Sequence, residues 1–147
     1  MLIKTFGSAV IGVDAITITV EVNVDRGMKF FMVGLPDNAV KESQQRIEAA
    51  LKHVGYKMPD KKVVVNMAPA DIRKQGSSYD LTIATGILAA SEQIKNDKVE
   101  QYMIMGELSL DGGVQPMKGA LPRLYKRGMR GLRDLYCPWR TRRKQRL

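Results

Sequence analysis

The sequence predicts an α+β domain with one mixed sheet and helices mainly on one face. Three observations indicate this class. Residues 15–25 alternate apolar and polar side chains with the period of a half-buried strand. Residues 38–54 carry apolar side chains at helical spacing, and residues 81–90 form a nearly continuous apolar run rich in small residues. The 147 residues are enough for one domain with a proper core.

The first part of the chain is predicted to form strands. Residues 3–6 and 9–13 are expected to form two short strands on either side of Gly7 and Ser8. The longer strand, residues 15–25, has its apolar side chains on one face: Ile16, Ile18, Val20, Val22 and Val24. Residues 29–33 are expected to be its hairpin partner, because Arg26 and Gly27 favour a turn between the two.

The first helix is expected to begin after Asp37 or Asn38, either of which can accept a hydrogen bond from a free backbone N–H. One stripe of this helix is apolar: Val40, Ile47, Leu51 and Val54. Gly55 is a typical residue to end it.

A central strand over residues 62–67, a polar loop over 68–78 and a buried helix over 81–90 follow. The small residues of that helix permit close approach to a sheet, and Ser77, Ser78 or Asp80 is the expected cap of its first turn. Residues 102–110 and 114–117 are predicted to form a hairpin around an Asp-Gly-Gly turn.

The net charge of +9 belongs to the end of the chain. Residues 1–122 contain 14 basic and 14 acidic side chains, whereas residues 123–147 contain ten basic side chains and Asp134 alone. A neutral body with a basic tail differs from a basic domain, because phosphate binding needs positive groups held along one surface. No apolar run is long enough to cross a membrane, residues 1–6 show no signal peptide, and Cys137 is the only cysteine. These features favour a cytoplasmic protein.

The residue types exclude several kinds of catalysis. No glycine is followed by lysine, so the chain has no phosphate-binding P-loop. His53 is the only histidine and there is no pair of nearby cysteines, so a zinc site lacks ligands. A serine–lysine dyad that uses the hydroxyls at residues 77–78 stays open beside the capping role.

Three segments together carry a family resemblance: residues 33–42 (VGLPDNAVKE), 65–81 (VNMAPADIRKQGSSYDL) and 106–112 (GELSLDG). They resemble the N-terminal domain of the ComM/YifB proteins, which are magnesium-chelatase-like AAA+ ATPases. The resemblance covers residues 1–122 and implies a Lon-protease-like fold, also called ribosomal-protein domain-2-like. It further implies a parent protein whose separate AAA+ module binds ATP and Mg²⁺. Such parents are hexameric helicases that move DNA branches during natural transformation, so sibling subunits, the AAA+ module and DNA are the implied partners.

The resemblance also tests the dyad. Residues 74–80 match the Lon loop K-D-G-P-S-A-G, which places Ser78 at the position of the nucleophile, while the position of the Lon lysine holds Leu121. Lys118 lies three residues too early. A serine without a neighbouring base stays protonated and is a poor nucleophile. We therefore expect no catalytic residue, cofactor or metal in this chain.

The same loop is instead a candidate for contacts with another subunit or with the AAA+ module. Its candidate residues are Asp71, Arg73, Lys74, Ser77, Tyr79 and Asp80. Of these, the charged side chains at 71, 73 and 74 are expected to be solvated.

Residues 123–147 depart from the family, whose members continue with an alanine-rich helix and a strand ending in L-P-x-x-N-A-x-E-A. Here the segment contains eight arginines and no periodicity. Synonymous codons exist for which a shifted frame encodes a family-like continuation. We therefore expect a frameshift just after Pro122 and a disordered tail. Two rival functions remain, a Lon-like serine peptidase that uses Ser78 and a small basic DNA-binding protein that uses this tail.

Overall fold

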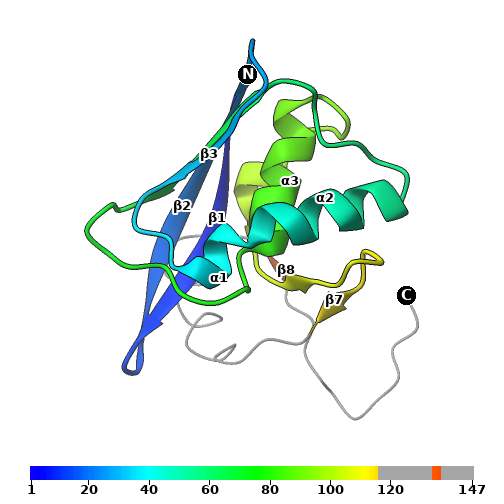
Figure 1. Ribbon diagram of the computed structural model, residues 1–147. Coiled ribbons are helices and arrows are strands. Elements are labelled where there is room, and N and C mark those ends of the chain that lie inside the picture. Colours follow the sequence, from blue (N-terminus) through cyan, green and yellow to red (C-terminus); the bar gives the residue numbers. More distant parts are fainter. Residues whose placement is uncertain (116–133, 137–147) are drawn as a thin grey trace.

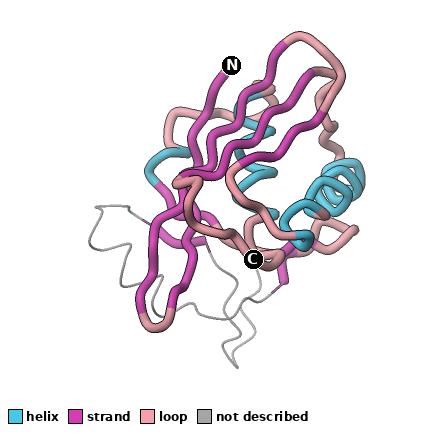
Figure 2. The backbone as a smooth tube through the Cα atoms, turned by 60° about the vertical axis from the view of Figure 1, so that its left-hand side comes forward, coloured by secondary structure: helices cyan, strands magenta, loops and turns pink. Residues whose placement is uncertain are grey.

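The computed structural model describes residues 1–115 and 134–136, which form a mixed six-stranded sheet in the order β3-β4-β2-β1-β5-β8 and a two-stranded sheet of β6 and β7 (Figure 1). The strands are β1 Leu2–Ile11, β2 Asp14–Asp25, β3 Phe30–Val33, β4 Lys62–Ala68, β5 Tyr102–Ile104, β6 Glu107–Leu108, β7 Val114–Gln115 and β8 Asp134–Tyr136. The helices are α1 Asn38–Lys41, α2 Ser43–His53, α3 Asp80–Ala90 and the 3₁₀ turn η1 Val99–Gln101. Helix α3 packs on β1 and β2, and α2 packs on α3 (Figure 2). The predicted fold class is therefore confirmed.

The centre of the sheet is the antiparallel hairpin of β1 and β2, paired from Leu2 with Asn23 to Ile11 with Asp14. The predicted alternation of β2 is confirmed from Ile18 to Val24 but not at the start of the strand, where Thr17 is buried and Ile16 is only partly buried. Its side chains toward the helices are buried: Ile18, Val20, Val22 and Val24. The two short strands expected before it are one continuous strand, because Gly7 allows close packing and makes no turn. A Cβ atom on Gly7 would lie 2.8 Å from Sδ of Met105.

The predicted partner of β2 was wrong. Strand β3 does not pair with β2 but runs parallel to β4, with Phe30 opposite Val63 and Val33 opposite Asn66. Strand β4, which was predicted correctly as a central strand, takes the place next to β2. The loop between β2 and β3 therefore crosses over β4, which leaves β3 at one edge of the described sheet.

The helical region after β3 begins as predicted, because the N–H of Val40 donates to Oδ1 of Asp37 at 2.8 Å. It is divided into α1 and α2 at Glu42. Val40, Ile47 and Leu51 are buried as expected, whereas Val54 lies beyond the end of α2 and is half exposed. The expected close approach of α3 is also present, since a Cβ atom on Gly86 would lie 2.5 Å from Cγ2 of Val22.

The predicted hairpin near residue 111 is present but shorter. Strand β5 joins the large sheet beside β1, and only β6 and β7 form the hairpin, with Leu108 opposite Val114. Strand β8, which was not predicted, runs parallel to β5. Apart from β8, the predicted tail, residues 123–147, lies outside the described residues. Leu121 also lies outside them. No helix in the described part of the chain combines the length and apolarity that a bilayer crossing requires.

Candidate functional site

The loop between β4 and α3, residues 69–79, lies beside the turn that follows β3 (Figure 1). Lys74 forms a parallel bridge with Pro36. Its N–H donates to the carbonyl of Leu35 at 3.0 Å, and its carbonyl accepts from the N–H of Asp37 at 3.0 Å. The middle of the loop is therefore held like a short strand against the turn.

The side chain of Lys74 was expected to be solvated, and this was wrong, because it is fully buried. Its Nζ donates to the carbonyl of Gly34 at 2.7 Å and to the carbonyl of Pro69. Burial lowers the pKa of Lys74 from its ordinary value of 10.5, and the nearby carboxylate of Asp71 opposes this shift. The ammonium group thus closes the loop onto the turn after β3.

Replacing Lys74 with methionine is expected to lower the free energy of unfolding by about 1–2 kcal/mol at neutral pH, because two carbonyls lose their donor. The difference in the free energy of unfolding between the wild type and Lys74→Met should grow as pH rises toward 10.5. Between the lowered pKa and 10.5 the unfolded state binds more protons than the folded one, so Lys74 contributes more stability as pH rises. Urea unfolding at two pH values measures both effects, with Lys52→Met on the exposed side of α2 as control. A pH dependence unchanged by Lys74→Met would contradict the assignment.

Asp80 joins three elements of the domain. Its carboxylate is fully buried and accepts hydrogen bonds from Ser43 Oγ at 2.5 Å and from the N–H of Leu108 at 3.1 Å. Nε and Nη2 of Arg46 donate to it at 2.6 and 3.0 Å. The hydrogen bond with Asp80 raises the pKa of Arg46, against the opposing effect of burial. Asp80 therefore ties α3 to α2 and β6.

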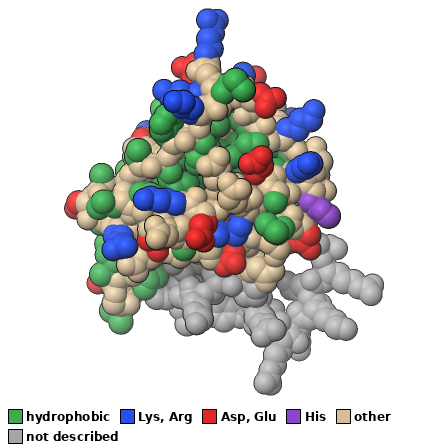
Figure 3. All heavy atoms as spheres, viewed as in Figure 1, with side chains coloured by type: hydrophobic (Ala, Val, Ile, Leu, Met, Phe, Trp, Pro, Cys, Tyr) green, Lys and Arg blue, Asp and Glu red, His purple; other side chains and the backbone are tan. Residues whose placement is uncertain are grey.

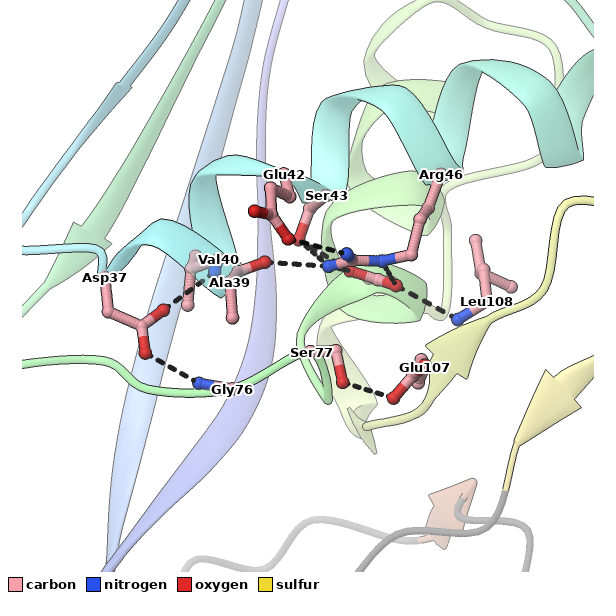
Figure 4. Close-up of polar contacts among 11 residues, drawn as sticks. Asp37, Ala39, Val40, Glu42, Ser43, Arg46, Gly76, Ser77, Glu107 and Leu108 are labelled. Atoms are coloured by element: carbon pink, nitrogen blue, oxygen red, sulfur yellow. Dashed lines mark hydrogen bonds and ion pairs between the residues drawn. The ribbon is translucent and has the colours of Figure 1, made fainter.

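The expected capping of α3 was wrong. Tyr79 occupies the cap position and makes no side-chain cap bond, while Asp80 bonds to other elements. The hydroxyl of Ser77 donates to the carboxylate of Glu107, and Oδ2 of Asp37 accepts from the N–H of Gly76 at 3.1 Å (Figure 4). Helix α2, strand β6 and the turn before α1 therefore hold the start of α3.

Ser78, which the family resemblance places at the Lon serine position, is partly exposed, and its carbonyl accepts from the N–H of Gly106 at 2.8 Å. Lys74 is the lysine nearest to it in the sequence, and its ammonium group is already bonded to two carbonyls. Tyr79 is buried and its hydroxyl donates to the carbonyl of Ser8 at 3.2 Å. Lys74 is thus not placed to act as a base for Ser78.

Of the candidate interaction residues, the structure leaves Asp71 and Arg73 exposed, as expected. Lys74, Tyr79 and Asp80 are buried and hold the domain together. Sequence reasoning missed the partners of these residues, above all Arg46, Ser43 and Glu107. One signal was available, because a carboxylate that opens a wholly apolar helix is buried with that helix and needs a cationic partner.

The described residues contain no group of three or more His, Cys, Asp or Glu side chains that could hold a metal ion. A cavity of about 380 Å³ lies between α3, β5 and β7. Its lining is mainly apolar, and the hydroxyl of Thr85 is bonded to the carbonyl of Leu81. Basic and acidic side chains are interspersed on the face that Figure 3 shows, in keeping with the neutral charge of residues 1–122.

Comparison with known proteins gives a consistent set of similarities. The family model described as "Subunit ChlI of Mg-chelatase" matches residues 20–140, a range that runs into the predicted tail. The chain is 46% identical over 114 residues to "Uncharacterized protein YifB" of Escherichia coli, covering 77% of this chain and 22% of that protein. It is 42% identical over 118 residues to "Competence protein ComM" of Haemophilus influenzae, covering 80% and 23%.

A more distant similarity involves a protease. The chain is 28% identical over 99 residues to "Lon protease 2" of Bacillus subtilis, covering 67% of this chain and 17% of that protein. The chain thus spans less than a quarter of the length of each of these relatives.

Proposed function

The chain belongs to the family described as subunit ChlI of Mg-chelatase, together with the YifB and ComM proteins, and we propose that it is a non-catalytic accessory domain of an AAA+ ATPase of this type. The observation that carries the proposal is that polar groups around the Lon serine position form hydrogen bonds within the domain. Lys74, Ser77 and Asp80 are all bonded to other parts of the domain. A loop held in this way offers a rigid surface and no activated nucleophile.

The reaction of the whole protein is placed elsewhere in this proposal. ATP and Mg²⁺ would bind a separate AAA+ module, and the parent would act as an ATP-dependent helicase that moves DNA branches during transformation. The name of the competence protein of Haemophilus influenzae supports the link to transformation. The domain would help to assemble a ring of sibling subunits or to hold DNA in the cytoplasm, while hydrolysis takes place in the other module.

A serine peptidase is the second candidate, and the similarity to Lon protease 2 favours it. The two candidates differ in the reactivity of Ser78. A fluorophosphonate probe is expected to leave Ser78 unlabelled, because no base is assigned to its hydroxyl, and an active serine hydrolase in the same reaction serves as the positive control. Labelling that disappears in Ser78→Ala would refute the accessory-domain proposal and support the peptidase.

A further inference from the structure

Strand β3 and Leu35, in the turn that follows it, expose a stripe of large apolar side chains. Phe31, Val33 and Leu35 are 43%, 48% and 54% exposed, and we call these three residues the β3 stripe. The side chains of Phe30 and Met32, which alternate with them, pack against the core. The β3 stripe therefore lies on the outward side of the sheet, away from the core.

The same strand has a free side. In the described sheet β3 is an edge strand that pairs only with β4. One of its two rows of backbone N–H and C=O groups therefore has no partner strand in this sheet. Natural edge strands are commonly protected by a very short length, a charged residue or a proline. Strand β3 is short, with four residues, but its sequence, FFMV, contains no charged residue and no proline. Such an edge can accept an additional strand.

The turn after β3 holds Leu35 in an unusual conformation. Leu35 has a φ of 55°, in the left-handed region where glycine and asparagine are favoured and leucine is not. Lys74 fixes this conformation, because its N–H donates to the carbonyl of Leu35 and its Nζ to the carbonyl of Gly34. A turn that only reversed the chain would be more stable with glycine here, so the exposed leucine points to a contact.

Cationic side chains lie at both ends of the β3 stripe. Nζ of Lys62 lies 5.5 Å from the ring centroid of Phe31, and Lys29 directly precedes β3. At the other end Arg73 lines a hollow of about 170 Å³ together with Leu35 and Pro36. A partner strand with carboxylates at both ends would therefore complement this surface.

These charges also argue against a second copy of the chain as the occupant. If two copies paired antiparallel through β3, Lys29 and Lys62 of one would face Arg73 of the other. A parallel pairing would place each cation opposite its equivalent. Either arrangement brings like charges together, which disfavours association.

We propose that the β3 stripe binds an extended segment of another protein, which adds to the sheet beside β3. This segment has apolar side chains at alternate positions and acidic residues at both ends. The backbone groups of β3 supply the hydrogen bonds, the β3 stripe contacts the apolar side chains, and Arg73 pairs with one carboxylate. The inference goes beyond the proposed function, because it concerns a binding surface and not the location of the chemistry.

The test uses the full chain and a fluorescent peptide in which three valines alternate with two threonines, with two glutamates at each end. Fluorescence anisotropy at about 0.15 M salt measures its affinity. The matched control peptide has the same sequence and charge but carries N-methyl groups on the amides of both edges, so that it cannot pair with β3 in either direction. The basic residues 123–147 attract both peptides equally, so the difference between them reports strand pairing. We expect the N-methylated peptide to bind at least about tenfold more weakly.

Two variants of the chain assign the binding to this surface. Leu35→Gly should weaken binding about fivefold while the melting temperature stays the same or rises, because it removes an apolar contact and relieves strain. Arg73→Glu should weaken binding of the glutamate peptide and strengthen binding of a matched peptide with lysines at its ends. Lys52→Glu, on the exposed side of α2, should change neither affinity.

Equal binding of the methylated and unmethylated peptides, or affinities unaffected by Leu35→Gly and Arg73→Glu, would overturn the proposal. A concentration-dependent dimer that Leu35→Gly dissociates in sedimentation experiments would also overturn it, because the occupant would then be a second copy. Neither result depends on the reactivity of Ser78.

Discussion

Replacing Asp80 with asparagine is expected to lower the free energy of unfolding by about 3–5 kcal/mol. The wild-type carboxylate is fully buried. It is the acceptor in its hydrogen bonds with Arg46, Ser43 and the N–H of Leu108. An asparagine side chain would present its NH₂ group to at least one of these donors and would leave the Arg46 guanidinium without its buried counter-charge. Urea unfolding followed by circular dichroism measures the loss.

The matched control for this prediction is Glu42→Gln. Glu42 also lies near Arg46, with 3.7 Å between Oε2 and Nη1, but its side chain is 69% exposed. Its removal should cost less than about 1 kcal/mol, as for other exposed ion pairs. Similar losses in the two variants would show that burial of the Asp80 contact does not stabilise the fold.

Gly34→Ala is expected to destabilise the domain by more than about 3 kcal/mol, and most of this effect should come from a steric clash. Gly34 has a φ of 99°, and a Cβ atom there would lie 2.1 Å from the carbonyl oxygen of Met67. The carbonyl belongs to the backbone of β4 and the Cβ atom would be fixed to the backbone directly after β3, so neither can move without breaking the pairing of these strands.

Gly55→Ala separates the clash from the backbone conformation. Gly55 has a similar φ of 90°, but a Cβ atom there would meet nothing within 4 Å. Its substitution should cost only the conformational strain of about 1–2 kcal/mol. Thermal unfolding of both variants gives the comparison, and equal losses would contradict the close approach at Gly34.

The identity of the strands could be predicted from the sequence more securely than their neighbours. Period-two alternation in residues 15–25 depends only on local burial, and the structure confirms that strand. Residues 29–33 instead pair with β4, which lies more than 30 residues further along the chain. No local sequence pattern indicates such a distant partner. A hairpin was the simplest interpretation of a short turn, and long-range pairing overrides it.

In the candidate site, too, local features could be predicted from the sequence, whereas contacts between distant residues could not. The family resemblance placed Ser78 and the loop around it at the Lon serine position, and the exposure of Asp71 and Arg73 followed from their charge. The burial of Lys74 could not be predicted from its surroundings, since its acceptors are carbonyls of Gly34 and Pro69 that only the fold brings together. Lysine ordinarily keeps its ammonium group in water, and the two converging carbonyls are what allow this one to be buried.

In the proposed function, this chain contributes structure and contacts to a reaction performed by another module. The most direct test of this proposal is phosphate release from ATP by the purified 147-residue chain, with Mg²⁺ and DNA present. We expect a rate equal to that of the protein-free control, because no glycine of the sequence is followed by the lysine that a P-loop requires. Turnover of about one ATP per second or faster, which is ordinary for an enzyme, would contradict it.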